Sequence, residues 1–228
     1  MRKQMHAQKE QGFTLIELMI VTTVIGVLAS VAVPNLLSSR VVANETAVIA
    51  TLRAVATAQA QFVTTNQLDV DGNGIGEYGT LGELGALEPL RDSGSPIGRN
   101  LLSASVATVQ ANGWASHHGF HFALYLPDAG GAGVQAIAAN AASISAANAQ
   151  VHWTCVAWPA TKGQTGTRAF FVNEQGLVLQ TRESTYSGTA AVPPAGAALL
   201  GGAATQIDLA GLAANTVGAD GNRWTVVQ

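Results

Sequence analysis

Cysteine and charged residues are scarce in this 228-residue sequence. Its one cysteine, Cys155, excludes an internal disulfide, a CxxC redox pair and a zinc site built from several thiolates. Charged residues make up 11% of the chain, compared with about 25% in an average soluble protein, and the net charge is −3. Since no basic run is longer than Arg2 and Lys3, we expect no nucleic-acid partner.

Motifs typical of catalytic sites are also absent. The sequence has no GxSxG or HExxH motif, and Cys155 is not part of a recognisable Cys–His motif. Residues Gly74–Gly79 have the spacing of a GxGxxG dinucleotide motif, but they follow a predicted helix instead of a strand and lie among acidic residues. We therefore expect a protein that is not an enzyme.

Three histidines, His117, His118 and His121, are close together in the sequence. The neighbouring aromatic residues favour a β-strand, in which His118 and His121 point to opposite faces. His117 and His121 would lie about 13 Å apart along such a strand, too far for one metal ion to bridge. We expect a surface cluster at these positions.

The amino-terminal region combines a short polar leader, residues 1–12, with a long apolar segment. From Phe13 to Val33, 21 residues contain one charged side chain, Glu17, and this length matches the roughly 20 residues that cross a bilayer as a helix. Basic residues in the leader place the amino terminus in the cytoplasm and the rest outside. A cleaved secretory signal fits less well, because its apolar region should span about 7–15 residues and end at a small-residue cleavage site.

Glu17 is unusual because a carboxylate inside a membrane-spanning helix is costly unless it has a partner. No Lys, Arg or His lies in the apolar segment. If the chain were cut after Gly12, the new α-amine of Phe13 would be a cation near the same helix end, available to Glu17 of a neighbouring copy. The sequence therefore predicts that Glu17 acts in assembly.

The hexapeptide GFTLIE from Gly12 to Glu17 resembles the cleavage and methylation signature of type IV pilins and type II secretion pseudopilins. The resemblance implies cleavage between Gly12 and Phe13 by a membrane prepilin peptidase and N-methylation of Phe13. It also implies that Glu17 pairs with a neighbour's amino terminus during filament growth. Gly26 and Pro34 fall where many pilins have a glycine and a proline, between which the helix loosens in the filament.

The predicted helix continues beyond the membrane-spanning segment. Residues 35–66 lack Gly and Pro, are rich in Ala, and repeat large apolar residues on one helical face: Val48, Leu52, Val55 and Phe62. Phe13–Asn66 is therefore predicted to be one long helix, bent at Pro34, whose second half is covered by a sheet. Three charged side chains are expected off this stripe, in contact with water or neighbouring subunits: Arg40, Glu45 and Arg53.

Downstream, four short aromatic or β-branched runs predict strands at 119–127, 151–159, 168–173 and 177–181, the last two joined by a tight turn. The resemblance implies an α+β type IV pilin fold, with the long helix packed on a small antiparallel sheet. The Ala- and Gly-rich tracts 129–150 and 187–219 are expected to be variable surface loops. Trp224 is the candidate anchor in place of the disulfide of many pilins. The predicted segments are the leader (1–12), a transmembrane and filament-core helix (13–34), an amphipathic helix (35–66), an acidic Gly-rich connection (67–100) and the sheet head (101–228).

The acidic connection begins like a calcium-binding loop. Asp69, Asp71 and Asn73 alternate and are followed by a glycine, which suits the several oxygen ligands and the sharp turn of a calcium loop. The EF-hand pattern then breaks, because its twelfth position is Thr80, so Glu77 or Glu83 would have to complete the ligands. Two interpretations stay open: a calcium site formed by Asp69, Asp71, Asn73 and Glu77, or a solvated turn-rich connection.

These observations predict a structural subunit of a type IV pilus. It would be inserted in the bacterial inner membrane as a precursor, processed by prepilin peptidase, and moved by an inner-membrane assembly platform into a homopolymeric, extracellular helical filament. The low charge of the head fits a surface packed against neighbours. Two alternatives stay open, a periplasmic type II secretion pseudopilin and a minor tip pilin that acts as an adhesin or DNA-binding module. No cofactor is required in any of them.

Overall fold

A computed structural model describes residues 12–209 and 211–227 of the chain. The chain divides into two compact units, Met1–Ser39 and Arg40–Gln228, of which the second is the head. Of the predicted leader, only Gly12 lies among the described residues.

One long helix, α1, runs from Leu15 to Thr64 and confirms the continuous helix predicted from the sequence. Pro34 lies inside it, as expected, and the helix continues on both sides of that residue. Every residue from Gly12 to Arg40 is exposed. Among the described helices, α1 is the one long and apolar enough to cross a membrane.

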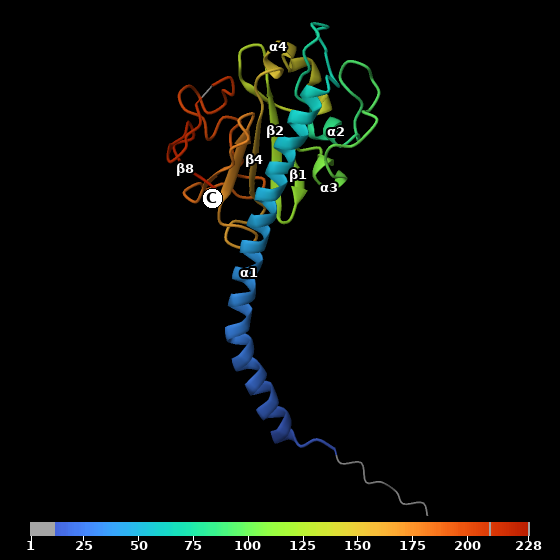
Figure 1. Cartoon of the computed structure of the whole chain (residues 1–228). Helices are drawn as coiled ribbons and strands as arrows, with labels where there is room; N and C mark the ends of the chain where they lie inside the picture. Colours follow the sequence, from blue (N-terminus) through green and yellow to red (C-terminus); the bar gives the residue numbers. More distant parts are fainter. Residues whose placement is uncertain (1–11, 210, 228) are drawn as a thin grey trace, which may run out of the picture. The chain divides into compact units, whose positions relative to one another are not determined.

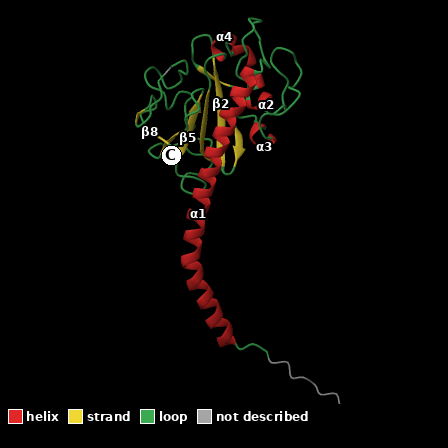
Figure 2. Ribbon diagram, in the orientation of Figure 1, coloured by secondary structure: helices red, strands yellow, loops and turns green. Residues whose placement is uncertain are grey.

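The head contains an antiparallel sheet, which confirms the α+β class (Figures 1 and 2). All four predicted strands are present, as β2, β4, β5 and β6, and Gly176 closes the predicted turn by donating to the Asn173 carbonyl. The strand order is β1-β2-β4-β5-β6-β8-β7, and β3 pairs with β2. The strands are β1 (Ala115–His117), β2 (Phe120–Pro127), β3 (Gly133–Gln135), β4 (Thr154–Pro159), β5 (Ala169–Asn173), β6 (Leu179–Thr181), β7 (Thr216–Val217) and β8 (Arg223–Val226).

The second half of α1 covers one face of the sheet, beside β1 and β2 in Figure 1. The predicted stripe is buried as expected, and its apolar side chains share one core with alternate residues of β2, β4 and β5. Gln59 is buried in the same row, where its amide both donates to and accepts from the backbone of Gly79. A Cβ at Gly79 would lie 3.0 Å from the ring of Phe62, so a larger residue there would force the ring or the chain to shift.

The carboxyl-terminal tract packs on the opposite face of the sheet and forms a second core. The expectation that 187–219 is a surface loop is therefore wrong in part, because Ala197, Ala198 and Leu199 are fully buried against β4 and β5 residues. Small side chains let this irregular tract lie close to the sheet, so that Ala contributes to the core in place of larger residues. Trp224 is fully buried as predicted, and it packs against Phe171.

The tract 129–150 is also more ordered than expected, since it contains β3 and two short helical turns. The short helices of the head are α2 (Leu81–Leu84), α3 (Ala104–Ala107), the 3-10 helix η1 (Ala138–Ser143) and α4 (Ala146–Ala149). The continuous strand expected through the histidines is wrong, because His118 and Gly119 form a tight turn with positive φ at both positions. This turn brings the rings of His117 and His118 together, with centroids 3.8 Å apart and ring planes tilted by 58°.

Candidate functional site

Thr14 and Glu17 form a capping box at the start of α1. The backbone N–H of Glu17 donates to Thr14 Oγ1 at 3.2 Å. In return, Glu17 Oε2 accepts from the backbone N–H and the hydroxyl of Thr14, both at 2.8 Å. These bonds give acceptors to the backbone N–H groups of Thr14 and Glu17, which have no carbonyl partner at a helix start. The Thr-x-x-Glu spacing is a signal for this local role, which the sequence analysis did not use.

The first half of α1 presents an apolar surface that nothing in the described chain covers. Phe13 is 93% exposed and Leu15 77%, and the large apolar side chains that follow stay more than half exposed through Val33. The hydroxyls of Thr22, Thr23 and Ser30 donate to carbonyls of their own helix, so they do not need water as an acceptor. Such a surface suits a bilayer or a neighbouring helix.

Gly26 and Pro34 both lie on this exposed half of α1. A Cβ at Gly26 would meet no atom within 4 Å, so no contact with the described residues requires the glycine. Their role in loosening the helix inside a filament stays a prediction.

Glu45, which is buried, and Arg168, which is partly exposed, form an ion pair between α1 and the sheet. The prediction that Glu45 contacts water or other subunits is wrong, since Glu45 is 2% exposed. Its Oε2 lies 2.6 Å from Arg168 Nη2, and its Oε1 accepts from the backbone and hydroxyl of Thr167, each at 2.8 Å. Burial alone would raise the pKa of Glu45, but the hydrogen bonds from Arg168 and Thr167 outweigh it and hold the pKa below 4.5.

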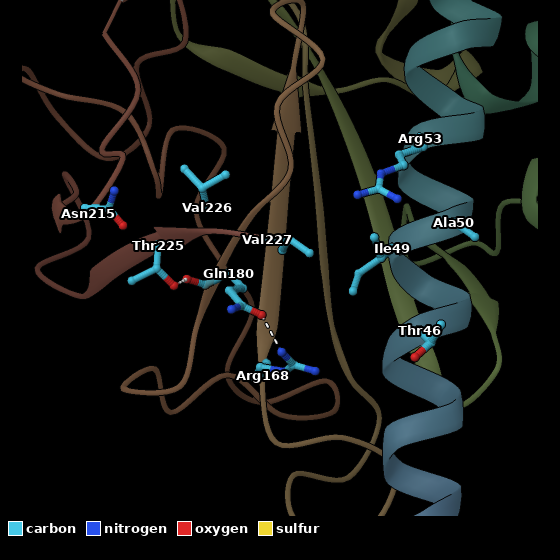
Figure 3. Close-up of a pocket in the computed structure, with 10 residues that line it drawn as sticks. All are labelled: Thr46, Ile49, Ala50, Arg53, Arg168, Gln180, Asn215, Thr225, Val226 and Val227. Atoms are coloured by element: carbon cyan, nitrogen blue, oxygen red, sulfur yellow. Dashed lines mark hydrogen bonds between the residues drawn. The ribbon is translucent and has the colours of Figure 1, made fainter.

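A groove with a volume of about 680 Å³ lies beside this ion pair, between α1 and the end of the chain (Figure 3). Side chains from both segments line it, among them Thr46, Ile49, Arg53, Thr225 and Val227. Arg168 also lines the groove, where its Nη1 donates to Gln180 Oε1 at 2.5 Å. The guanidinium group of Arg168 is thereby held between Glu45 and Gln180.

The acidic loop between α1 and α2 brings three carboxylates together. One oxygen from each of Asp69, Asp71 and Glu77 lies within 4.8 Å of the others. The Asn73 side chain supports the loop, because its Oδ1 accepts from the N–H of Ile75 and its Nδ2 donates to Asp71 Oδ2. Three of the four predicted calcium ligands therefore converge, and Asn73 lies against one of them.

Glu77 is the buried member of this group and Arg91 is its nearest cation. Glu77 Oε1 accepts from the backbone N–H of Val70 at 2.8 Å, and Oε2 lies 3.9 Å from Arg91 Nη2. Burial raises the pKa of Glu77, and the charges of Asp71 and Asp69 act in the same direction. The hydrogen bond from Val70 and the charge of Arg91 oppose that rise without cancelling it.

Glu83, the alternative ligand, is used elsewhere. Its Oε2 accepts from the N–H of Thr80 at 2.7 Å in the capping box of α2, and its Oε1 accepts from the N–H and Nε of Arg91. The structure therefore brings Glu77 to the loop cluster and holds Glu83 at a helix start.

The amino-terminal match, the exposed apolar helix and the sheet head support the class of type IV pilins and type II secretion pseudopilins for this chain. Residues 7–33 match the prokaryotic N-terminal methylation motif. The chain belongs to the family described as "Protein of unknown function (DUF2950)", which matches residues 29–191.

Named relatives match a smaller part of the chain. The type IV major pilin protein PilA of Myxococcus xanthus is 40% identical over 62 residues, 27% of this chain and 28% of that protein. The type IV wide pilus major component PilA4 of Thermus thermophilus is 46% identical over 56 residues, 25% of this chain and 43% of that protein. The type II secretion system core protein G of Klebsiella pneumoniae is 44% identical over 48 residues, 21% of this chain and 34% of that protein.

Each match spans less than half the length of the relative. No solved structure matches the chain. These relatives are named as pilus and secretion-system components.

Proposed function

We propose that this chain is a structural subunit of an extracellular type IV pilus. The observation that carries the proposal is the exposed apolar half of α1, which has one carboxylate, Glu17, in its first turn. Each large apolar side chain gains about 1.5–3 kcal/mol when it is fully buried, so this surface needs a bilayer before assembly and neighbouring helices afterwards. A membrane-anchored precursor that enters a filament of like subunits satisfies both needs.

In this proposal, prepilin peptidase cuts between Gly12 and Phe13 and the new amine of Phe13 is methylated. Glu17 then meets the Phe13 amine of a neighbouring copy as the assembly platform moves the subunit out of the inner membrane. The capping box holds the Glu17 carboxylate at the exposed start of the helix, where an incoming amine can reach it. Pairing with that amine compensates a charge that would otherwise be buried alone.

A second candidate is a type II secretion pseudopilin, which would assemble in the periplasm. The observation that favours it is the match to type II secretion system core protein G from Klebsiella pneumoniae. Pilins and pseudopilins use the same kind of amino-terminal helix, so the distinction depends on where the chain accumulates.

The test is electron microscopy with mass spectrometry of filaments sheared from cells, using an antibody against the head. We expect the chain to be abundant in sheared filaments and to begin at Phe13. A strain carrying Gly12→Val is the control that should lose the labelled filaments. If the chain stays in the envelope fraction, or labels only filament tips, it is a pseudopilin or a minor pilin and the proposal is wrong.

A further inference from the structure

We propose that Asp69, Asp71 and Glu77 form a calcium site in the loop that joins α1 to α2. The proposal goes beyond the filament function, because the site belongs to the head and does not depend on assembly. It rests on two observations, the convergence of the three carboxylates and a buried oxygen of Glu77 that has no hydrogen bond among the described residues.

The spacing of the carboxylates suits one calcium ion. Oxygens bound to calcium lie about 2.3–2.6 Å from the ion, so two of them can be about 5 Å apart at most. One oxygen from each of Asp69, Asp71 and Glu77 already satisfies that limit, since all three lie within 4.8 Å of one another. Only small side-chain adjustments are needed for the three groups to share an ion.

Backbone groups hold two of the carboxylates in place. Asp69 accepts from the N–H of Asn73 at 3.0 Å and from the N–H of Gly74 at 2.9 Å, and Asp71 accepts from Asn73 at 3.2 Å. Gly72 and Gly74 both have positive φ, which lets the loop turn back on itself. Each carboxylate still has lone pairs available for a cation.

Glu77 supplies the second observation. Its side chain is fully buried, and among the described residues its Oε2 has no hydrogen-bond partner. A buried carboxylate oxygen without a partner is rare in folded proteins and points to an unassigned ligand such as an ion or a water molecule. The acidic neighbours Asp69 and Asp71 make that ligand a cation.

Arg91 does not fill this role. Its Nη2 lies 3.9 Å from Glu77 Oε2, beyond hydrogen-bond distance, and donates instead to the Tyr78 carbonyl. Its Nε donates to Glu83 Oε1 at 3.2 Å. One guanidinium group is thus shared between two buried carboxylates, and Asp69 and Asp71 add two further negative charges.

Calcium suits this donor set better than magnesium. Calcium accepts six to eight oxygens in flexible geometry, whereas magnesium requires a near-octahedral site and keeps several of its waters. Bound at this loop, calcium would join the end of α1 to the segment that follows α4. The end of α4 and the residue after it already contact the loop, since the backbone N–H of Tyr78 donates to the Ala149 carbonyl and Gln150 Nε2 donates to Asp71 Oδ2.

The test is calorimetric titration of the processed full-length chain in detergent with calcium chloride or magnesium chloride, after treatment with EGTA. Thermal unfolding is followed by tryptophan fluorescence in the same samples. We expect calcium binding, and a midpoint raised by about 3–6 °C at a calcium concentration tenfold above Kd. Magnesium at equal concentration should give a much smaller shift.

Three variants locate the site. Asp71→Asn changes an exposed side chain and Glu77→Gln changes the buried one, and each should weaken calcium binding by at least about tenfold, because a charged ligand is lost. Asp208→Asn makes the same charge change at an exposed residue outside the loop and should bind calcium like the wild type. The proposal is wrong if the wild type does not bind calcium, if Asp71→Asn and Glu77→Gln bind it normally, or if magnesium acts equally well.

Discussion

Glu45 on α1 and Arg168, next to the start of β5, form an ion pair with 2.6 Å between Oε2 and Nη2. The two residues are separated by 123 positions in the sequence, so the pair joins the helix to the far half of the head. Glu45 is almost completely buried, and its two oxygens accept hydrogen bonds from Thr167 and Arg168. The charge of the buried Glu45 carboxylate is therefore tolerated because Arg168 supplies the opposite charge.

Replacing Arg168 by alanine is therefore expected to destabilise the head by about 3 kcal/mol, because Glu45 would stay buried without its counter-charge. The measurement is denaturant unfolding of the full-length chain in detergent. Arg53→Ala removes an exposed arginine of α1, the helix that carries Glu45, and should change the free energy of unfolding by less than about 0.5 kcal/mol. Equal effects of the two substitutions would show that the ion pair does not hold the helix on the sheet.

The same pair predicts a loss of stability in acid. The pKa of Glu45 is lower in the folded head than its ordinary value of 4.5. Its ionised form therefore stabilises the fold above about pH 4.5, and this contribution is lost as the pH falls through the lower, folded-state pKa. We expect the stability difference between the wild type and Glu45→Gln to be constant from about pH 6 to 7 and to shrink below about pH 4.5. A difference that does not change with pH would contradict this assignment.

Two substitutions at Glu17 separate its local role from its role in assembly. Gln at this position can keep the capping box with Thr14 but carries no charge, whereas Ala removes both. If pairing with a neighbour's Phe13 amine drives assembly, both variants should insert in the membrane and lose filaments. The yield should fall by at least about tenfold, since about 1.4 kcal/mol corresponds to a tenfold change in an equilibrium constant.

The measurement is filament yield in sheared material, with Phe13 processing checked by mass spectrometry. Thr14→Ser keeps a hydroxyl cap and should assemble normally. Wild-type yield from Glu17→Gln would mean that the carboxylate serves only to cap the helix.

Processing is expected to fail when Gly12 is replaced by valine. A Cβ at Gly12 would meet no atom of the described residues within 4 Å, so the substitution should leave the fold of the head intact and act on recognition by the peptidase. The precursor should stay in the membrane at full length, as measured by intact mass. His6→Ala within the leader is the control and should be processed. Normal cleavage of the Gly12 variant would place the junction elsewhere.

Local sequence patterns predict most of the fold. The Ala-rich apolar repeat predicts α1, and the aromatic runs predict the four central strands, because periodicity and strand propensity act over a few neighbouring residues. The contact of Glu45 with Arg168 has no local signal, since it depends on how distant segments meet. The carboxyl-terminal core was missed for a related reason, because Ala and Gly show no periodicity and only tertiary packing buries Ala197 and Ala198.

The candidate sites divide in the same way. The junction at Gly12 and the charge of Glu17 are visible in one short motif, and so is the alternation of Asp69 and Asp71. The burial of Glu77 and the competing bonds of Arg91 require the folded head. The Thr-x-x-Glu spacing of the capping box is also present in the sequence. It was not used, because a carboxylate is so unusual in an apolar segment that Glu17 was interpreted as an assembly residue alone.

The central claim is that the exposed half of α1 becomes the core of a filament. The most direct measurement is a cryo-electron-microscopy reconstruction of filaments sheared from cells that express this chain. We predict a core of packed helices formed by residues 13–39, with Glu17 of each subunit beside the Phe13 amine of a neighbour. Filaments that lack this chain, or a reconstruction in which these helices do not form the core, would contradict the account.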